Sequence, residues 1–176
     1  MRLTLTYRGN LPATQRGVGK VKAVLREAFH PQIAAQFGHR LGPAVREAST
    51  EINGHTFVAP AHPRLRTAAE LEVLLLTPAS SRSVGDVDNR LKTLVDGLTR
   101  PANTEQMQSF KPPAPGGPTY CLMDDDQLVK RLTVDARRWF EPGIPPDEAL
   151  VVVTANIILG DDADMSSPTA SIFVVL

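Results

Sequence analysis

The apolar run at residues 149–159 is the feature that most constrains how this chain folds. It falls well short of the roughly 20 apolar residues that a helix needs to cross a bilayer. Thr154 and Asn156 also interrupt it. A short run of this kind is typical of a strand that is buried in the core of a sheet. We therefore expect a buried strand here and no membrane-spanning segment.

The rest of the chain mixes strand and helix patterns without a regular alternation. Helical spacing predicts a helix that starts at Val18 and ends at Pro31, a short helix at residues 32–41 and a clear one at residues 89–98. Alternating residues predict further strands, of which the second and third are expected to pair: residues 2–8, 56–59, 70–76, 128–134 and 170–176. We predict a single α+β domain, residues 1–176, with a mixed β-sheet packed with helices.

Two segments are predicted to lie between these elements. Residues 100–120 hold five prolines and two adjacent glycines, which favours a loop insertion. A connection of that length inside a compact domain tends to be functional or disordered. Residues 160–164 read as the turn between the last two strands.

Composition narrows the class of protein. A hydrophobic content of 42% with 22% charged residues is typical of a globular chain. The one cysteine, Cys121, excludes an internal disulfide and the Cys₄ and Cys₂His₂ zinc sites. Residues 1–7 alternate and lack the apolar core of a signal peptide. A cytoplasmic location is therefore expected.

Charge is unevenly distributed along a chain whose formal net charge is zero. Residues 1–66 hold ten basic and three acidic residues, and residues 67–176 hold nine basic and sixteen acidic residues. A basic half can track phosphates while an acidic half holds metal ions, although two ordinary solvated surfaces would give the same balance. The candidate DNA-binding residues lie on or beside the outward side of the first helix: Arg16, Lys20, Lys22 and Arg26.

Acidic residues gather around the clear helix. In an extended chain before it, Asp86 and Asp88 would project to the same side, and two carboxylates suit a hard cation. Asp88, Lys92 and Asp96 follow at spacings of four and share one polar strip of the helix. Lys92 could then lean toward the metal site and stabilise charge on a phosphate.

A second acidic group, Asp124, Asp125 and Asp126, directly precedes a predicted strand. If that strand lies beside the clear helix, one of these carboxylates can complete a metal site. Such a metal lowers the pKa of a bound water and polarises a phosphodiester. The pattern alone leaves open which of the three aspartates is the ligand.

This ordered pattern resembles the RusA family of Holliday junction resolvases. The family motif runs Asp-x-Asp-Asn, then a lysine and an aspartate at fixed spacing, then Asp-Asp-x-Gln-x-Val before a strand. The matching residues fall within about residues 85–134: Asp86, Asp88, Asn89, Lys92, Asp96, Asp124, Asp125, Gln127 and Val129.

The resemblance implies a RusA-like fold and a metal-dependent endonuclease that resolves four-way or related branched DNA. It implies that Asp86, Asp88 and Asp125 are catalytic metal ligands for Mg²⁺, with Mn²⁺ as an alternative. Lys92 would be their essential partner, with support from Asn89, Asp96, Asp124 and Asp126. The family acts as a homodimer that nicks two strands symmetrically.

Other interpretations remain open at this point. Asp88 alone is more often a helix N-cap, and Lys92 with Asp96 an ordinary surface ion pair. The three consecutive aspartates alone would usually form a solvated turn. The chain could also be a catalytically silent, structure-selective DNA-binding protein. A transferase that holds a metal–nucleotide complex through its Asp-x-Asp is less favoured, because no glycine-rich nucleotide motif is present.

Overall fold

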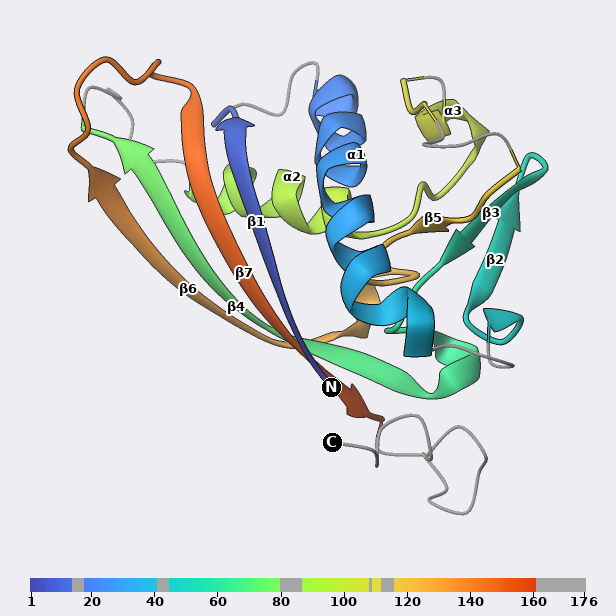
Figure 1. Cartoon of the computed structure of the whole chain (residues 1–176). Helices are drawn as coiled ribbons and strands as arrows, with labels where there is room; N and C mark the ends of the chain where they lie inside the picture. The colour runs from blue at the N-terminus through green and yellow to red at the C-terminus, as the bar shows by residue number, and fades with distance from the viewer. Residues whose placement is uncertain (14–17, 41–44, 80–86, 108, 112–115, 161–176) are drawn as a thin grey trace.

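Four long strands form the main sheet of the computed structural model, which describes residues 1–13, 18–40, 45–79, 87–107, 109–111 and 116–160. These are β1 (Arg2–Asn10), β4 (Thr67–Pro78), β6 (Val129–Trp139) and β7 (Glu148–Leu159), in the order β1-β7-β4-β6 (Figure 1). β7 pairs antiparallel with β1 and with β4, whereas β6 pairs parallel with β4. The sheet is mixed, as predicted.

β7 is the apolar run of the sequence, and it lies between two partner strands. Its inward residues alternate along the strand and are buried, among them Val151, Val153 and Ile157. The residues between them are only half-buried. One face of β7 therefore joins the main core, and the prediction of a buried strand is confirmed for that face.

One long helix, α1 (Val18–Phe37), stands beside β1, where two shorter helices were predicted to meet at Pro31. That prediction was wrong. Proline inside a helix removes a hydrogen bond and costs about 3 kcal/mol. Here the fully buried Phe29 and Ile33, on either side of Pro31, belong to one apolar stripe that continues to Phe37. Burial of that stripe outweighs the local cost.

Helix α2 (Val87–Leu98) confirms the clear helix of the sequence and packs against α1. Leu94 and Leu98 are buried in the same core as the inward residues of the sheet. The two helices approach closely at Gly97, where an added Cβ would lie 2.7 Å from atoms of Leu25. Among the described residues, no helix has both the length and the apolar character needed to cross a membrane.

A second, smaller sheet contains β2 (Ser49–Ile52), β3 (His55–Val58) and β5 (Thr119–Tyr120). The hairpin of β2 and β3 turns at Asn53-Gly54, both with positive φ, as a two-residue turn of this type requires. The sequence prediction missed β2 and wrongly paired β3 with β4, which lies in the other sheet.

The segment predicted as a loop, residues 100–120, contains the short helix α3 (Thr104–Met107) as well as β5. Its Phe110 is buried beside Phe57 of β3. Short 3-10 turns complete the fold: η1 (Gly38–Arg40), η3 (Pro63–Leu65) and η4 (Asp126–Leu128). The strand predicted at residues 170–176 and most of the turn at 160–164 lie outside the described residues.

Candidate functional site

The polar strip of α2 lies on its solvent side. Asp88 and Lys92 are exposed, and Asp96 is half-buried. Asp88 belongs to the first turn of the helix, not to an extended chain before it as predicted. In that position its carboxylate is favoured by the positive end of the helix dipole. Asp86 lies outside the described residues.

Asp96 and the second acidic group of the sequence line one pocket of about 140 Å³, whereas Asp88 does not reach it. Asp96 comes from the last turns of α2, and Asp124, Asp125 and Asp126 come from the segment that leads into β6. The second acidic group therefore lies beside the C-terminal end of the clear helix, about two turns from Asp88. The other lining residues come from α1, from the chain between α2 and α3, and from α3 itself: Arg26, Thr99, Arg100, Ala102 and Gln106.

Two basic residues of α1 hold the end of α2 in place. Lys22 Nζ lies 2.6 Å from a carboxylate oxygen of Asp96. Arg26 donates from Nε to the carbonyl of Thr99 and from Nη2 to the carbonyl of Asp96, each at 2.8 Å. Arg26 is only 2% exposed, so its expected place on the outward side of the helix was wrong. Burying a guanidinium is tolerated because these carbonyls satisfy it.

The remaining candidate DNA-binding residues are divided. Lys20 is exposed on α1, as predicted, and Lys22 is engaged with Asp96. Arg16 lies outside the described residues. Of the four candidate DNA-binding residues, Lys20 is therefore the one that is exposed in the described part of the chain.

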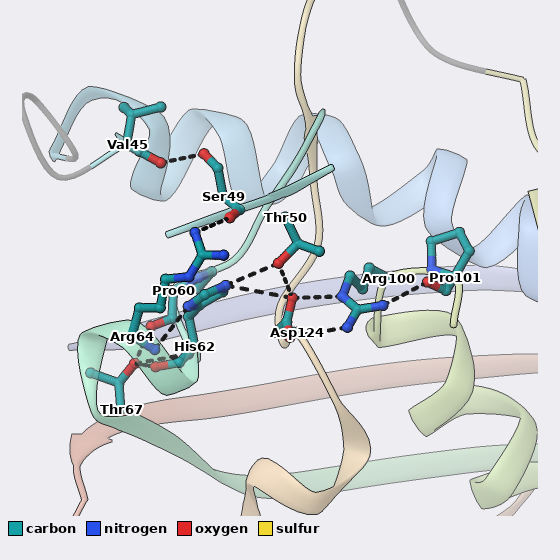
Figure 2. Close-up of polar contacts among 10 residues, drawn as sticks. All are labelled: Val45, Ser49, Thr50, Pro60, His62, Arg64, Thr67, Arg100, Pro101 and Asp124. Atoms are coloured by element: carbon teal, nitrogen blue, oxygen red, sulfur yellow. Dashed lines mark hydrogen bonds and ion pairs between the residues drawn. The ribbon is translucent and has the colours of Figure 1, made fainter. Parts of the chain in front are cut away.

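Asp124 is bound by its neighbours within the protein (Figure 2). Arg100 donates from Nε to Oδ1 at 2.6 Å and from Nη2 to Oδ2 at 3.2 Å, and the Thr50 hydroxyl donates to Oδ1 at 2.7 Å. Burial alone would raise the pKa of Asp124, but these bonds outweigh it and hold the pKa below its ordinary value. Asp124 is consequently a structural carboxylate.

His62 completes this network from the other side of Asp124. Its Nδ1 accepts a hydrogen bond from the backbone N–H of Arg64 at 3.1 Å, so the neutral ring carries its proton on Nε2. That nitrogen lies 3.1 Å from Thr50 Oγ1 and 3.6 Å from Asp124 Oδ1. Burial lowers the pKa of His62, which favours the neutral ring. Each polar atom of the chain His62–Thr50–Asp124 therefore has a partner.

Asp125 and Asp126 differ from Asp124 because both are exposed. Asp125 caps the turn η4, and its Oδ1 accepts the backbone N–H of Gln127 at 2.9 Å. The pKa of Asp126 is raised, first by partial desolvation and then by its neighbour Asp125 and by the negative charge of Asp96. Carboxylates that repel one another beside solvent favour binding of a cation, which would relieve the repulsion.

The other predicted site residues lie farther along α2. With a rise of about 1.5 Å per residue, Lys92 and Asp88 are about 6 Å and 12 Å from Asp96 along the helix axis. Asn89 donates to the carbonyl of Ala13 at 3.2 Å and so ties α2 to the chain after β1. Within the described residues, no three acidic, histidine or cysteine side chains converge closely enough to hold a metal ion.

Three residues around the pocket carried no signal in the sequence. Arg100, Thr50 and His62 come from separate segments and converge on Asp124, and Thr50 also contacts His62 directly. No local spacing links them, and a lone histidine or arginine is more often structural than functional. Only a pairing of β2 with β3, which the Asn53-Gly54 turn signals, would have brought Thr50 close to the chain before His62.

The hydrogen bonds of Asp124 predict that its loss destabilises the protein, whereas loss of the nearby Asp126 does not. Asp124→Asn should lower the free energy of unfolding by about 2–3 kcal/mol, because Arg100 would lose a charged partner at a half-buried site. Asp126→Asn should leave stability unchanged or raise it, because it removes repulsion. Urea unfolding of both variants measures this difference; equal losses would contradict the distinction.

The same network fixes the sign of its pH dependence. Because the folded-state pKa of Asp124 is lowered, its contribution is present above the usual value of 3.8 and is lost as pH falls through the folded value.

Comparison with known proteins adds no further constraint. No family model, curated protein or solved structure matches this chain. The functional argument therefore rests on the residues and geometry described above.

Proposed function

We propose that this protein is a Mg²⁺-dependent endodeoxyribonuclease that cuts four-way or related branched DNA, as RusA-type resolvases do. The observation that carries the proposal is the convergence of Asp96 with Asp125 and Asp126 at one pocket. These carboxylates come from two segments of the sequence that both belong to the resemblance.

The donor set suits Mg²⁺, which prefers carboxylate oxygens and retains several of its waters. Asp125 and Asp126, with Asp96 beside them at the pocket, would hold the ion. The resemblance adds Asp86 and Asp88 as ligands. Asp124 is excluded from this set because Arg100 and Thr50 occupy both of its oxygens. When bound, the ion supplies an activated water and polarises the scissile phosphate.

The chain's own residues have distinct tasks under this proposal. Lys22 and Arg26 fix the end of α2, so that Asp96 stays at the pocket. Lys92, exposed on the same strip of α2, would stabilise the negative charge that develops on the phosphate. Lys20, on the neighbouring helix, would contact the DNA backbone. Paired incisions would require two copies of the chain, acting in the cytoplasm.

The direct test is incubation of the full chain with end-labelled four-way junctions across a Mg²⁺ titration, followed by mapping of the nicks. We expect paired, symmetric nicks with Mg²⁺ and none with EDTA. Matched linear duplex of the same sequence is the control and should remain uncut. Junction binding without cleavage under Mg²⁺ or Mn²⁺ would instead support the catalytically silent DNA-binding protein.

A further inference from the structure

The two edges of the main sheet differ in how they are closed. At the β1 edge, Gln36 pairs with the backbone of Thr4: Oε1 accepts its N–H at 3.0 Å, and Nε2 donates to its carbonyl at 2.8 Å. Gln32 pairs with Thr6 in the same way, with both distances 2.8 Å. Four residues of helix rise about 6 Å and two of strand about 6.6 Å, so the spacings match. The β1 edge is thereby closed by α1.

The β6 edge has no such cover among the described residues. β6 forms the outer edge of the sheet in Figure 1 and pairs on one side only, with β4. Long open edges of this kind attract further strands, and proteins usually shield them. Three large apolar side chains of the described chain are exposed, and two of them are on β6 or directly after it: Leu132, 41% exposed, and Phe140, 79% exposed.

We propose that a second copy of this chain pairs with this edge through its own β6, in antiparallel register with Ala136 opposite Ala136. In this register Leu132 of each copy lies opposite Phe140 of the other copy. The two-fold axis therefore gives two such contacts. The two exposed apolar side chains of each copy are thus covered by each other. Their burial provides the main driving force for the pairing.

Charge supports the same register. Asp135 and Arg137 are already paired within one strand. About Ala136, Asp135 also faces Arg137 of the second copy, so four charges alternate in sign around the axis. Arg131 likewise faces Glu141. Opposite charges directly across an antiparallel pair are favourable, and like charges are unfavourable.

Shifting the register removes these matches. With Val134 on the axis, Arg131 faces Arg137 and Lys130 faces Arg138, which places like charges opposite each other. With Thr133 on the axis, Arg131 faces Asp135, but Phe140 has no partner strand beside it. Self-complementarity therefore favours a second copy in the Ala136 register over an unrelated extended peptide, which would need to match both the charges and Leu132.

The proposed nuclease activity calls for two copies, but the β6 pairing is argued from the sheet edge and does not depend on cleavage. A protein that forms this pair and never cuts DNA would leave the inference intact. A nuclease whose copies pair elsewhere would overturn it and leave the proposed function standing.

Single-cysteine cross-linking of the full chain tests the register. Native Cys121 is buried, and burial raises the pKa of its thiol to about 12, so it should not react. Ala136→Cys places two thiols on residues whose Cα atoms are about 5 Å apart in the pair. A short bis-methanethiosulfonate should join them into a covalent dimer. Thr133→Cys is the control, because its two copies would be about 20 Å apart. A stronger cross-link at position 133 than at 136 would overturn the register.

A second measurement tests the contact itself. Phe140→Asp should weaken dimerisation at least tenfold in sedimentation equilibrium, since it removes the larger apolar side chain of the pair. Val24→Asp is the matched control: Val24 is the third exposed apolar side chain, 48% exposed, and lies on α1. It should leave dimerisation unchanged. A wild type that stays monomeric at micromolar concentrations, or equal effects of the two variants, would overturn the proposal.

Discussion

Asp125→Asn is expected to abolish junction cleavage while the protein stays as stable as the wild type. Asp125 is exposed and caps η4 through one oxygen, at 2.9 Å from the backbone nitrogen of Gln127. Asparagine is an equally good cap, so the turn should survive. What is lost is the negative charge that would hold the metal ion. Loss of one preorganised charged group typically lowers a catalytic rate by roughly a hundredfold to a thousandfold, and a metal ligand should reach the upper end.

The measurement is single-turnover cleavage of a labelled junction at saturating protein, with junction binding measured in parallel in Ca²⁺. Asp147→Asn, which neutralises an exposed carboxylate of the loop before β7, is the matched control and should retain full activity. Asp86→Asn and Asp88→Asn should behave like Asp125→Asn. Full activity in Asp125→Asn would remove this residue from the site, and full activity in all three variants would contradict the metal mechanism.

The parts of the fold that the sequence predicted well are those with a strong local period. The stripe of Leu94 and Leu98 placed α2 to within two residues, alternation placed β1, and the continuous apolar run placed β7. In each element one face is buried along its whole length, so several positions carry the same signal and the prediction does not depend on any one of them. The α+β class with a mixed sheet followed from the same elements.

The errors occurred where long-range contacts outweighed a local signal. Pro31 is a strong helix breaker, yet the buried stripe from Phe29 to Phe37 carries α1 through it. Strand pairing failed for a related reason, since period alone gives no partner. β3 and β4 are successive strands in the sequence, but the hairpin turn at Asn53-Gly54 pairs β3 with β2 instead.

The candidate site shows the same division. Its carboxylates were visible because they stand close together in the sequence, whereas their different roles were not. Asp124 and Asp125 are adjacent, but the first is bound by Arg100 and Thr50 and the second faces solvent. Arg26 was placed wrongly because a charged residue is expected at the surface. Its burial depends on hydrogen bonds to carbonyls at the end of α2, which is distant in the sequence.

Lys92→Ala is expected to lower cleavage by roughly a hundredfold or more without weakening metal binding, which separates Lys92 from the aspartates. Lys92 is exposed on α2, about one turn from Asp96, and no described carboxylate forms an ion pair with it. Its charge is therefore available to a phosphate. Removing a nearby positive charge should leave metal affinity unchanged or slightly higher.

The distinction is measurable because a metal-organising role and a phosphate-stabilising role respond differently to the ion. Single-turnover cleavage across a Mg²⁺ titration should show a reduced plateau for Lys92→Ala at an unchanged midpoint. Lys92→Arg should recover only part of the rate, since a planar guanidinium does not replace a compact ammonium at a fixed distance. Lys111→Ala, which removes another exposed lysine, should behave like the wild type. If excess Mg²⁺ restores Lys92→Ala to the full rate, Lys92 organises the metal site and does not act on the phosphate.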